Sequence, residues 1–330
     1  MVVPGTRPES DSRSAADAAF GARTGRTAAE LPEPSDPLEM WWRAVALGGA
    51  GHYAAAHTAL RRLSAATVDP VLLSLAASTQ GSLLRQLGWH RRAAEYDGRA
   101  AALVLPALAT LPAASPRTVS AAVRGSGPDP RTAPPGGAAA ALGDYGRRPD
   151  SIDAVADALI GLAADALGVG RTALSTRLLD RCVALLERPA PECSARAAGA
   201  PARVRGRMRL HWVRAEIALA DGLGAPALAA AEAALALAEQ GPSVRHRIKS
   251  RLLVAAAASA TGQTARAVAL ADRIDEECRV SGSVPLRWAC AMLRGGLAAE
   301  PGDRDTAVAD AAACRALISR RGGRFRDGRG

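Results

Sequence analysis

Residues 215–227, AEIALADGLGAPA, contain the pattern that decides the fold: a small residue, a glycine seven positions later and an alanine five positions after that. Residues 44–56, AVALGGAGHYAAA, and residues 255–267, AAAASATGQTARA, repeat it. Two antiparallel helices approach closely where their facing positions carry little side chain, and glycine supplies the left-handed conformation that ends the first helix. The pattern therefore predicts a series of helical hairpins, turning at Gly51, Gly88, Gly168, Gly222, Gly262 and Gly302.

The composition favours helices over sheets. Only 3% of the 330 residues are aromatic, so Leu, Val and Ala must supply most of the buried surface. A helical stack accommodates these residues better than a sheet sandwich, which needs β-branched and aromatic side chains. Because a stack of hairpins grows in one dimension, a chain of this length needs no second core. We expect an all-α chain of about six antiparallel helical hairpins.

Changes in composition divide the chain into five segments. Between the second and third hairpins, prolines and glycines interrupt any helix longer than two turns, which indicates a linker. The beginning of the chain lacks helical periodicity and its end is rich in arginine, so we expect both to be disordered. The predicted segments are a disordered arm (1–35), hairpins one and two (36–105), a linker rich in Pro, Gly and Ala (106–149), hairpins three to six (150–320) and a basic disordered tail (321–330).

The order of small residue, turn glycine and alanine, with a tryptophan early in the first helix, resembles the tetratricopeptide repeat family. The tryptophans are Trp41 and Trp212, each three residues before the small residue of its hairpin. The resemblance is degenerate, because even the three short intervals between adjacent pattern glycines are 37 to 40 residues where that family has a repeat of about 34. It implies a right-handed superhelix whose first helices line a concave groove that binds proteins or peptides. A generic all-α stack of hairpins is the alternative.

Seven residues are candidates for this groove. Ser78, Ser82 and Arg85 fall on one helical stripe and would form a polar floor for hydrogen bonds to a peptide. The alternative is a solvated helix face, although serine is a poor residue for a helix interior. The other four candidates, in the fourth and fifth hairpins, are Arg209, Trp212, Glu216 and Lys249.

Arg209 and Lys249 each lie six residues before the packing alanine of their hairpin, so stacking would place them side by side. Two cations at one edge of a groove suit an acidic partner segment or a carboxylate terminus. The alternative is arginine that reflects codon bias on a solvated face. Trp212 either packs in the core or anchors a ligand.

The basic charge suggests a second class of partner. The net charge is +10, and Lys249 is the single lysine among 42 basic residues. Arginines cluster at 203–214, at 245–251 and in the tail, and such patches could contact phosphates. No recognisable DNA-reading helix-turn-helix is present, and aromatic residues are too few to stack on single strands. A regulatory protein that contacts nucleic acid is therefore the alternative function.

The sequence contains no pattern typical of an enzyme. No pair of histidines has zinc-protease spacing, and no glycine-rich loop follows a strand to hold phosphate. The five cysteines are odd in number and widely spaced, which indicates neither a disulfide framework nor a zinc site. No signal peptide or membrane span is recognisable. We expect a non-enzymatic cytoplasmic scaffold or regulatory adaptor without cofactor or metal, whose concave groove binds a protein or peptide.

Overall fold

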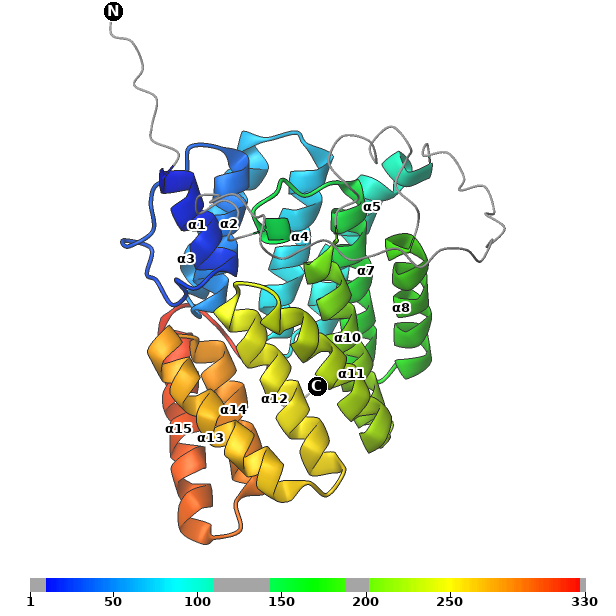
Figure 1. Cartoon of the computed structure of the whole chain (residues 1–330). Coiled ribbons are helices and arrows are strands. Elements are labelled where there is room, and N and C mark those ends of the chain that lie inside the picture. Colours follow the sequence, from blue (N-terminus) through cyan, green and yellow to red (C-terminus); the bar gives the residue numbers. More distant parts are fainter. Residues whose placement is uncertain (1–9, 110–142, 188–201, 327–330) are drawn as a thin grey trace, which may run out of the picture.

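A computed structural model describes residues 10–109, 143–187 and 202–326, and within these ranges the regular structure is helical. Helices pair in sequence order to form six antiparallel hairpins, which confirms the predicted fold class (Figure 1). The pairs are α2 (Pro37–Gly49) with α3 (Tyr53–Ala66), α4 (Pro70–Arg85) with α5 (His90–Ala109), α7 (Ser151–Gly168) with α8 (Thr172–Leu186), α10 (Val204–Ala220) with α11 (Gly224–Glu239), α12 (Val244–Ala260) with α13 (Thr264–Ser281), and α14 (Val284–Leu297) with α15 (Pro301–Arg320).

Aspartates start the first helices of three hairpins. The Asp36 carboxylate accepts a hydrogen bond from the amide of Glu39 at 2.9 Å, and Asp69 caps α4 in the same manner. Each of these caps precedes a proline, whose missing amide hydrogen costs nothing in the first turn of a helix. Asp150 and Asp153 form a reciprocal capping box at the start of α7. An aspartate followed by proline or serine is a helix-start signal that the sequence itself carries.

Four of the six pattern glycines turn their hairpins as predicted. Gly51, Gly88, Gly222 and Gly262 have φ angles of 83°, 86°, 72° and 76°, in the left-handed region. The paired small residues of the first, fourth and fifth hairpins are completely buried, so helices meet there without intervening side chains. These pairs are Ala44 with Ala56, Ala215 with Ala227, and Ala255 with Ala267.

The pattern is wrong about the turn in the third and sixth hairpins. In the third, Gly170 has the positive φ of 78°, whereas Gly168 is the last residue of α7. Counted from Gly170, the packed pair becomes Ala163 and Ser175, and the buried Ser175 hydroxyl donates to the Ala163 carbonyl at 2.7 Å. Gly302 lies in the first turn of α15. Glycine is so frequent in this chain that Gly168 and Gly302, which lie near the turns without forming them, matched the pattern by accident.

The expectation of a disordered arm over residues 1–35 is wrong for the described part of that segment. Residues Ser10–Phe20 form α1, and its last residues are buried against α2. The amide of Val244 at the start of α12 donates to the Gly21 carbonyl at 3.2 Å. A short helix of this kind is marginal alone and is stabilised by tertiary packing, so the local sequence gives little sign of it.

The chain end is also ordered through residue 326, which corrects the predicted disordered tail there. The indole of Trp89 donates to the Arg324 carbonyl at 2.7 Å, and the Phe325 ring lies 4.8 Å from the ring of Trp288. The amide of Ala54 in α3 donates to the Arg321 carbonyl at 2.9 Å. These contacts join the last hairpin to the first two, so the array curls back on itself (Figure 1).

The predicted linker 106–149 is partly helical. Helix α5 continues to Ala109, and Gly143–Tyr145 form a 3-10 turn, η1, whose Tyr145 is buried. Residues 110–142 lie outside the described residues.

Candidate functional site

The first helices of all six hairpins surround a central cavity of about 540 Å³. Its wall includes residues of α2, α4, α7, α10, α12 and α14, and Phe20 at the end of α1. The volume lies within the range of roughly 300–1,000 Å³ that is common for ligand sites. All seven residues proposed from the sequence line this cavity: Ser78, Ser82, Arg85, Arg209, Trp212, Glu216 and Lys249.

Counting back from the turning glycine of each hairpin identifies the face of the first helix that lines the cavity. The tenth position before that glycine lines the cavity in five hairpins, once Gly170 replaces Gly168 in the third. Equivalent positions on stacked first helices face the same side, so one register selects one wall. The five residues are Trp41, Ser78, Ile160, Trp212 and Leu252.

Arg85 is part of a buried ionic centre. Its Nη1 donates to Asp97 Oδ2 at 2.9 Å, to Asp165 Oδ1 at 2.6 Å and to the Gly161 carbonyl at 3.0 Å. Burial, reinforced by the charge of Asp165 and opposed by that of Arg85, raises the pKa of Asp97 to about 7. Arg85 therefore holds three helices together as well as lining the cavity, a structural role that its sequence position does not reveal.

A second ionic centre contains more cations than anions. Arg205 and Arg209, one turn apart on α10, both pair with Asp157 of α7, and Arg205 Nη1 lies 2.8 Å from Asp157 Oδ1. Arg245 of α12 lines the same cavity and lies against Gly49, where a Cβ would come 2.9 Å from its Cδ. Among the described residues its hydrogen bond is to a backbone carbonyl, that of Ala19 at 3.3 Å, and no carboxylate lies within ion-pair distance.

Lys249, Glu216 and Trp212 form a third group. The Lys249 ammonium lies 2.7 Å from Glu216 Oε1 and 6.0 Å from the ring centre of Trp212. The Trp212 indole donates to Ser250 Oγ at 2.8 Å, so its polar edge is satisfied and its ring lines the cavity. Lys249 and Arg209 thus line one cavity, as the sequence suggested, but each is paired with a different carboxylate.

The serine stripe of α4 is divided between two roles. Ser78 and Ser82 line the cavity, and the buried Ser78 hydroxyl has no hydrogen-bond partner among the described residues. Ser74, on the same predicted stripe, points into the hairpin and donates to the Ala100 carbonyl at 2.9 Å. Helical spacing alone could not tell the serines that line the cavity from the one that packs inside the hairpin. Residues four apart are slightly more than one turn apart, so successive serines of the stripe point in different directions, and Ser74 points toward α5.

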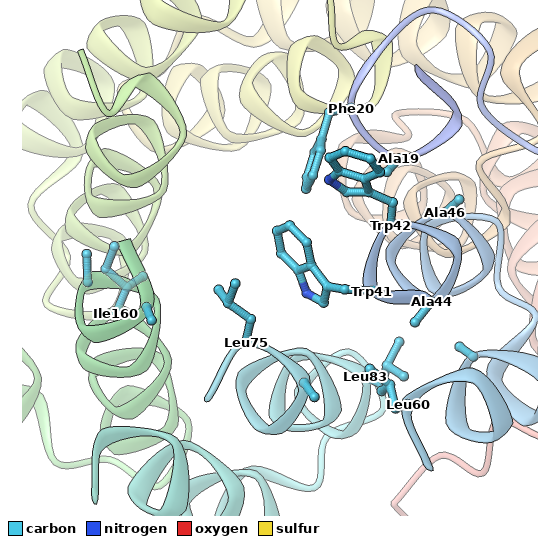
Figure 2. Close-up of a cluster of buried hydrophobic side chains, with 14 of the residues drawn as sticks. Ala19, Phe20, Trp41, Trp42, Ala44, Ala46, Leu60, Leu75, Leu83 and Ile160 are labelled. Atoms are coloured by element: carbon cyan, nitrogen blue, oxygen red, sulfur yellow. The ribbon is translucent and has the colours of Figure 1, made fainter. Parts of the chain in front are cut away.

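Aromatic residues, scarce in this chain, gather at one end of the cavity. Figure 2 shows Phe20 and Trp41 close together there, with ring centres 5.6 Å apart. Arg205 lies 5.4 Å from the centre of the Phe20 ring, and His246 packs against Phe20, Tyr145 and Trp212 at 5.4 to 5.9 Å. Burial and the nearby arginines lower the pKa of His246 well below its usual value, so the ring is neutral at pH 7.

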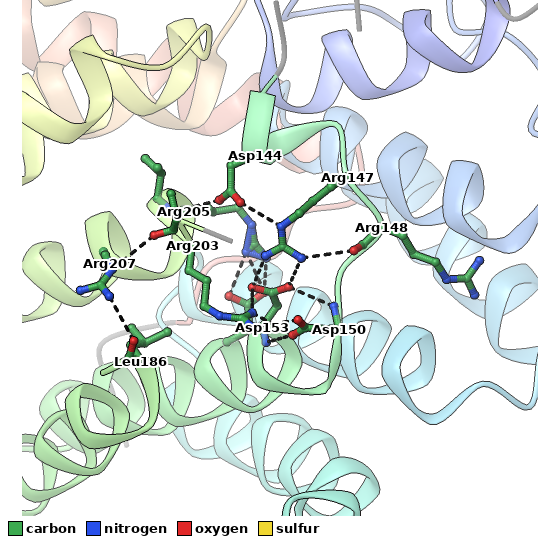
Figure 3. A network of polar contacts seen from close by, with 12 residues as sticks. Asp144, Arg147, Arg148, Asp150, Asp153, Leu186, Arg203, Arg205 and Arg207 are labelled. Carbon is green, nitrogen blue, oxygen red and sulfur yellow. Dashed lines mark hydrogen bonds and ion pairs between the residues drawn. The ribbon is translucent and has the colours of Figure 1, made fainter. Parts of the chain in front are cut away.

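Most arginines of the 203–214 patch make contacts inside the protein. Arg203 Nη2 pairs with Asp150 and its Nη1 with Asp153, both at 2.8 Å, and Arg147 joins the same network (Figure 3). Arg207 donates to the Leu186 carbonyl at 3.0 Å. Arg203 and Arg207 thus link α10 to α7 and α8, and these two side chains do not form a free surface for phosphates.

Sequence analysis missed several residues of the cavity wall, notably Phe20, Asp157, Arg205, Arg245 and Trp288. One signal was available. The 40-residue interval between Gly222 and Gly262 also separates Arg205 from Arg245 and Arg209 from Lys249. No pattern pointed to Phe20 or Trp288, because the segments that bring them to the cavity approach it through tertiary contacts.

No cluster of three or more His, Cys, Asp or Glu side chains among the described residues has an arrangement that could hold a metal ion. None of the described helices combines the length and the apolar character needed to cross a membrane.

Fold and site together define an all-α array of helical hairpins around an internal cavity. No protein-family model matches the chain, and no curated protein is similar to it. Among solved structures it is similar to TPR-like repeats of a kinesin light chain from Podosopora anserina, at 16% identity and a TM-score of 0.40, over 77% of this chain and 100% of that one. A single-residue variant of the same protein gives 16% identity and a TM-score of 0.41, over 77% and 99%.

Proposed function

We propose that the central cavity binds a short peptide segment of a partner protein, so that the chain acts as a scaffold or regulatory adaptor. The observation that carries the proposal is the convergence of all six first helices on one cavity of about 540 Å³. Its wall combines apolar and aromatic surface with polar and charged side chains that can fix the orientation of a ligand. The buried, unpartnered Ser78 hydroxyl supports the same function, because such a group needs a hydrogen-bond partner.

The proposal places the seven candidate residues in two roles. Ser78, Ser82, Trp212, Glu216 and Lys249 would contact the peptide. Arg85 and Arg209 are both paired with carboxylates: Arg85 would mainly shape the wall, whereas Arg209 keeps donor groups without an acceptor in the described part of the chain. The 203–214 patch gives the nucleic-acid alternative less support, because Arg203 and Arg207 bind groups within the protein.

Selection of peptides from a random library tests this function. Peptides are selected on the wild-type protein, and their affinities for two variants are then measured by fluorescence anisotropy. Ser82→Trp places a bulky ring in the cavity, and Ser64→Trp places the same ring on the exposed face of α3. We expect Ser82→Trp to weaken binding at least tenfold and Ser64→Trp to leave it unchanged. Failure to select any saturable peptide, or equal binding to both variants, would contradict the proposal.

A further inference from the structure

Charge is unevenly distributed around the cavity. At the end near Phe20, the guanidinium groups of Arg205, Arg209 and Arg245 have one paired anion among the described residues, the carboxylate of Asp157. At the Arg85 centre the balance is reversed, since two carboxylates surround one guanidinium. Within the cluster near Phe20, positive charges therefore exceed negative charges by two.

The neighbouring polar network, in which three carboxylates face two guanidinium groups, offsets this charge only in part. Asp144, Asp150 and Asp153 are bonded to Arg147 and Arg203, on the side of Arg205 that faces a second, smaller cavity of about 40 Å³ (Figure 3). These carboxylates are thus already used by two arginines. Lys249 is likewise paired with Glu216, and it adds no net charge.

Arg245 experiences the excess charge directly. Burial, followed by the charges of Arg205 and Arg209, lowers the pKa of Arg245 to about 10. An arginine remains charged at pH 7 under these conditions, and it is held among like charges without a carboxylate partner. Such an arrangement is unfavourable in the empty protein and favourable once an anion binds.

Donor groups at this end are free to receive that anion. Within the described part of the chain, Nε and Nη2 of Arg209 and Nε and Nη1 of Arg245 have no acceptor. The Nδ1 atom of His246, also on the cavity wall and buried, has none either. Planar guanidinium groups match the oxygens of phosphate in a bidentate manner.

We infer that the cluster of Arg205, Arg209 and Arg245 binds a dianionic phosphate monoester. Within this cluster the guanidinium charges exceed the carboxylate charge by two, which equals in size the charge of about −2 that a phosphate monoester carries at neutral pH. Phe20, Trp41 and His246 provide ring surface beside the phosphate position. The inference rests on the proposed function in that both use the same cavity, and it specifies the chemistry of the ligand's anchoring group.

Calorimetric titration with phenyl phosphate tests the inference. We expect the wild-type protein to bind it at least tenfold more tightly than benzenesulfonate, which has the same ring and one negative charge. Arg245→Met should weaken phenyl phosphate binding at least tenfold, and Arg245→Lys should have an intermediate effect. Arg266→Met is the matched control, because it removes an exposed arginine of α13 that pairs with Glu232 of α11. This variant should bind phenyl phosphate as the wild type does.

Thermal unfolding provides a readout that a purely structural arginine would not give. Without ligand, Arg245→Met should melt at a higher temperature than the wild type, because repulsion with Arg205 and Arg209 is removed. With phenyl phosphate at constant ionic strength, the melting temperature of the wild type should rise and that of Arg245→Met should not. Equal binding of the monoanion, or an unchanged phosphate response in Arg245→Met, would overturn the inference.

Further titrations identify the source of the phosphate and separate this inference from the proposed function. Inorganic phosphate, adenosine 5′-monophosphate and a phosphoserine tripeptide are compared, and the tightest probe identifies the carrier. If peptides selected on the cavity bind while no phosphate probe does, the phosphate inference fails and the proposed function stands. If phosphate probes bind and no peptide can be selected, the proposed function fails and the phosphate site stands.

Discussion

At the scale of single residues, Asp97 makes stability depend on pH. Its native pKa of about 7 exceeds the value of about 3.9 expected in the unfolded chain, so the native state binds an additional proton between these two pH values. The resulting stability is fully present below pH 4 and is lost as the pH rises to about 7.

Replacement of Asp97 by Asn should remove this dependence. We expect Asp97→Asn to gain free energy of unfolding relative to the wild type as the pH rises from 4 to 7, measured by urea denaturation across the window. Asp180→Asn, on the exposed face of α8, is the control and should run parallel to the wild type. A constant difference between Asp97→Asn and the wild type would contradict a raised pKa.

Gly161 makes room for the same carboxylate. A Cβ at this position of α7 would overlap the carboxylate of Asp97, whereas a Cβ at Gly98 of α5 would meet no atom within 4 Å. Gly161→Ala should therefore destabilise the protein by about 2 kcal/mol. Gly98→Ala should stabilise it by up to about 1 kcal/mol, because alanine favours helix. Urea denaturation of the two variants would show opposite signs, and equal shifts would exclude this packing.

At the scale of elements, α1 covers one end of the cavity through a single aromatic residue. Phe20 is 3% exposed and packs against Trp41, Tyr145 and His246. Phe20→Ala should lower the free energy of unfolding by about 3 kcal/mol, because it removes a buried ring and leaves a cavity.

Chemical denaturation followed by tryptophan fluorescence measures this effect. Val68→Ala, at a position that is 94% exposed, provides the comparison and should change stability by less than about 0.5 kcal/mol. If Phe20→Ala is no more costly than Val68→Ala, α1 does not pack on the array as described.

At the scale of the whole molecule, the chain end holds the curled array together. Removal of residues 321–330 would eliminate the contacts of Arg321 with α3, of Arg324 with Trp89 and of Phe325 with Trp288. We expect hydrogen exchange to become faster in α14 and α15, because the last hairpin would lose the contacts that the chain end makes with the first two hairpins. Unchanged exchange there would show that the preceding hairpins hold the last one without the tail.

Much of the architecture could be predicted from local patterns. The helix starts at Pro37, Pro70 and Ser151 follow from capping residues, and the turns at Gly51, Gly88, Gly222 and Gly262 follow from the need for positive φ. The pattern was wrong at Gly168 and Gly302 because glycine is abundant enough to match by accident. The order of α1 and of the chain end could not be predicted, since both are stabilised by contacts with distant hairpins.

The sequence by itself determined the hairpins and a register that selects one face of the first helices. Both depend on interactions over a few residues, such as capping, turn conformation and the close packing of alanine pairs. Tertiary structure alone decided that this face encloses a cavity, that Arg85 and Arg209 are held by carboxylates, and that Arg245 has no such partner among the described residues. The balance of buried charge depends on which distant side chains meet, and no local pattern in the chain contains that information.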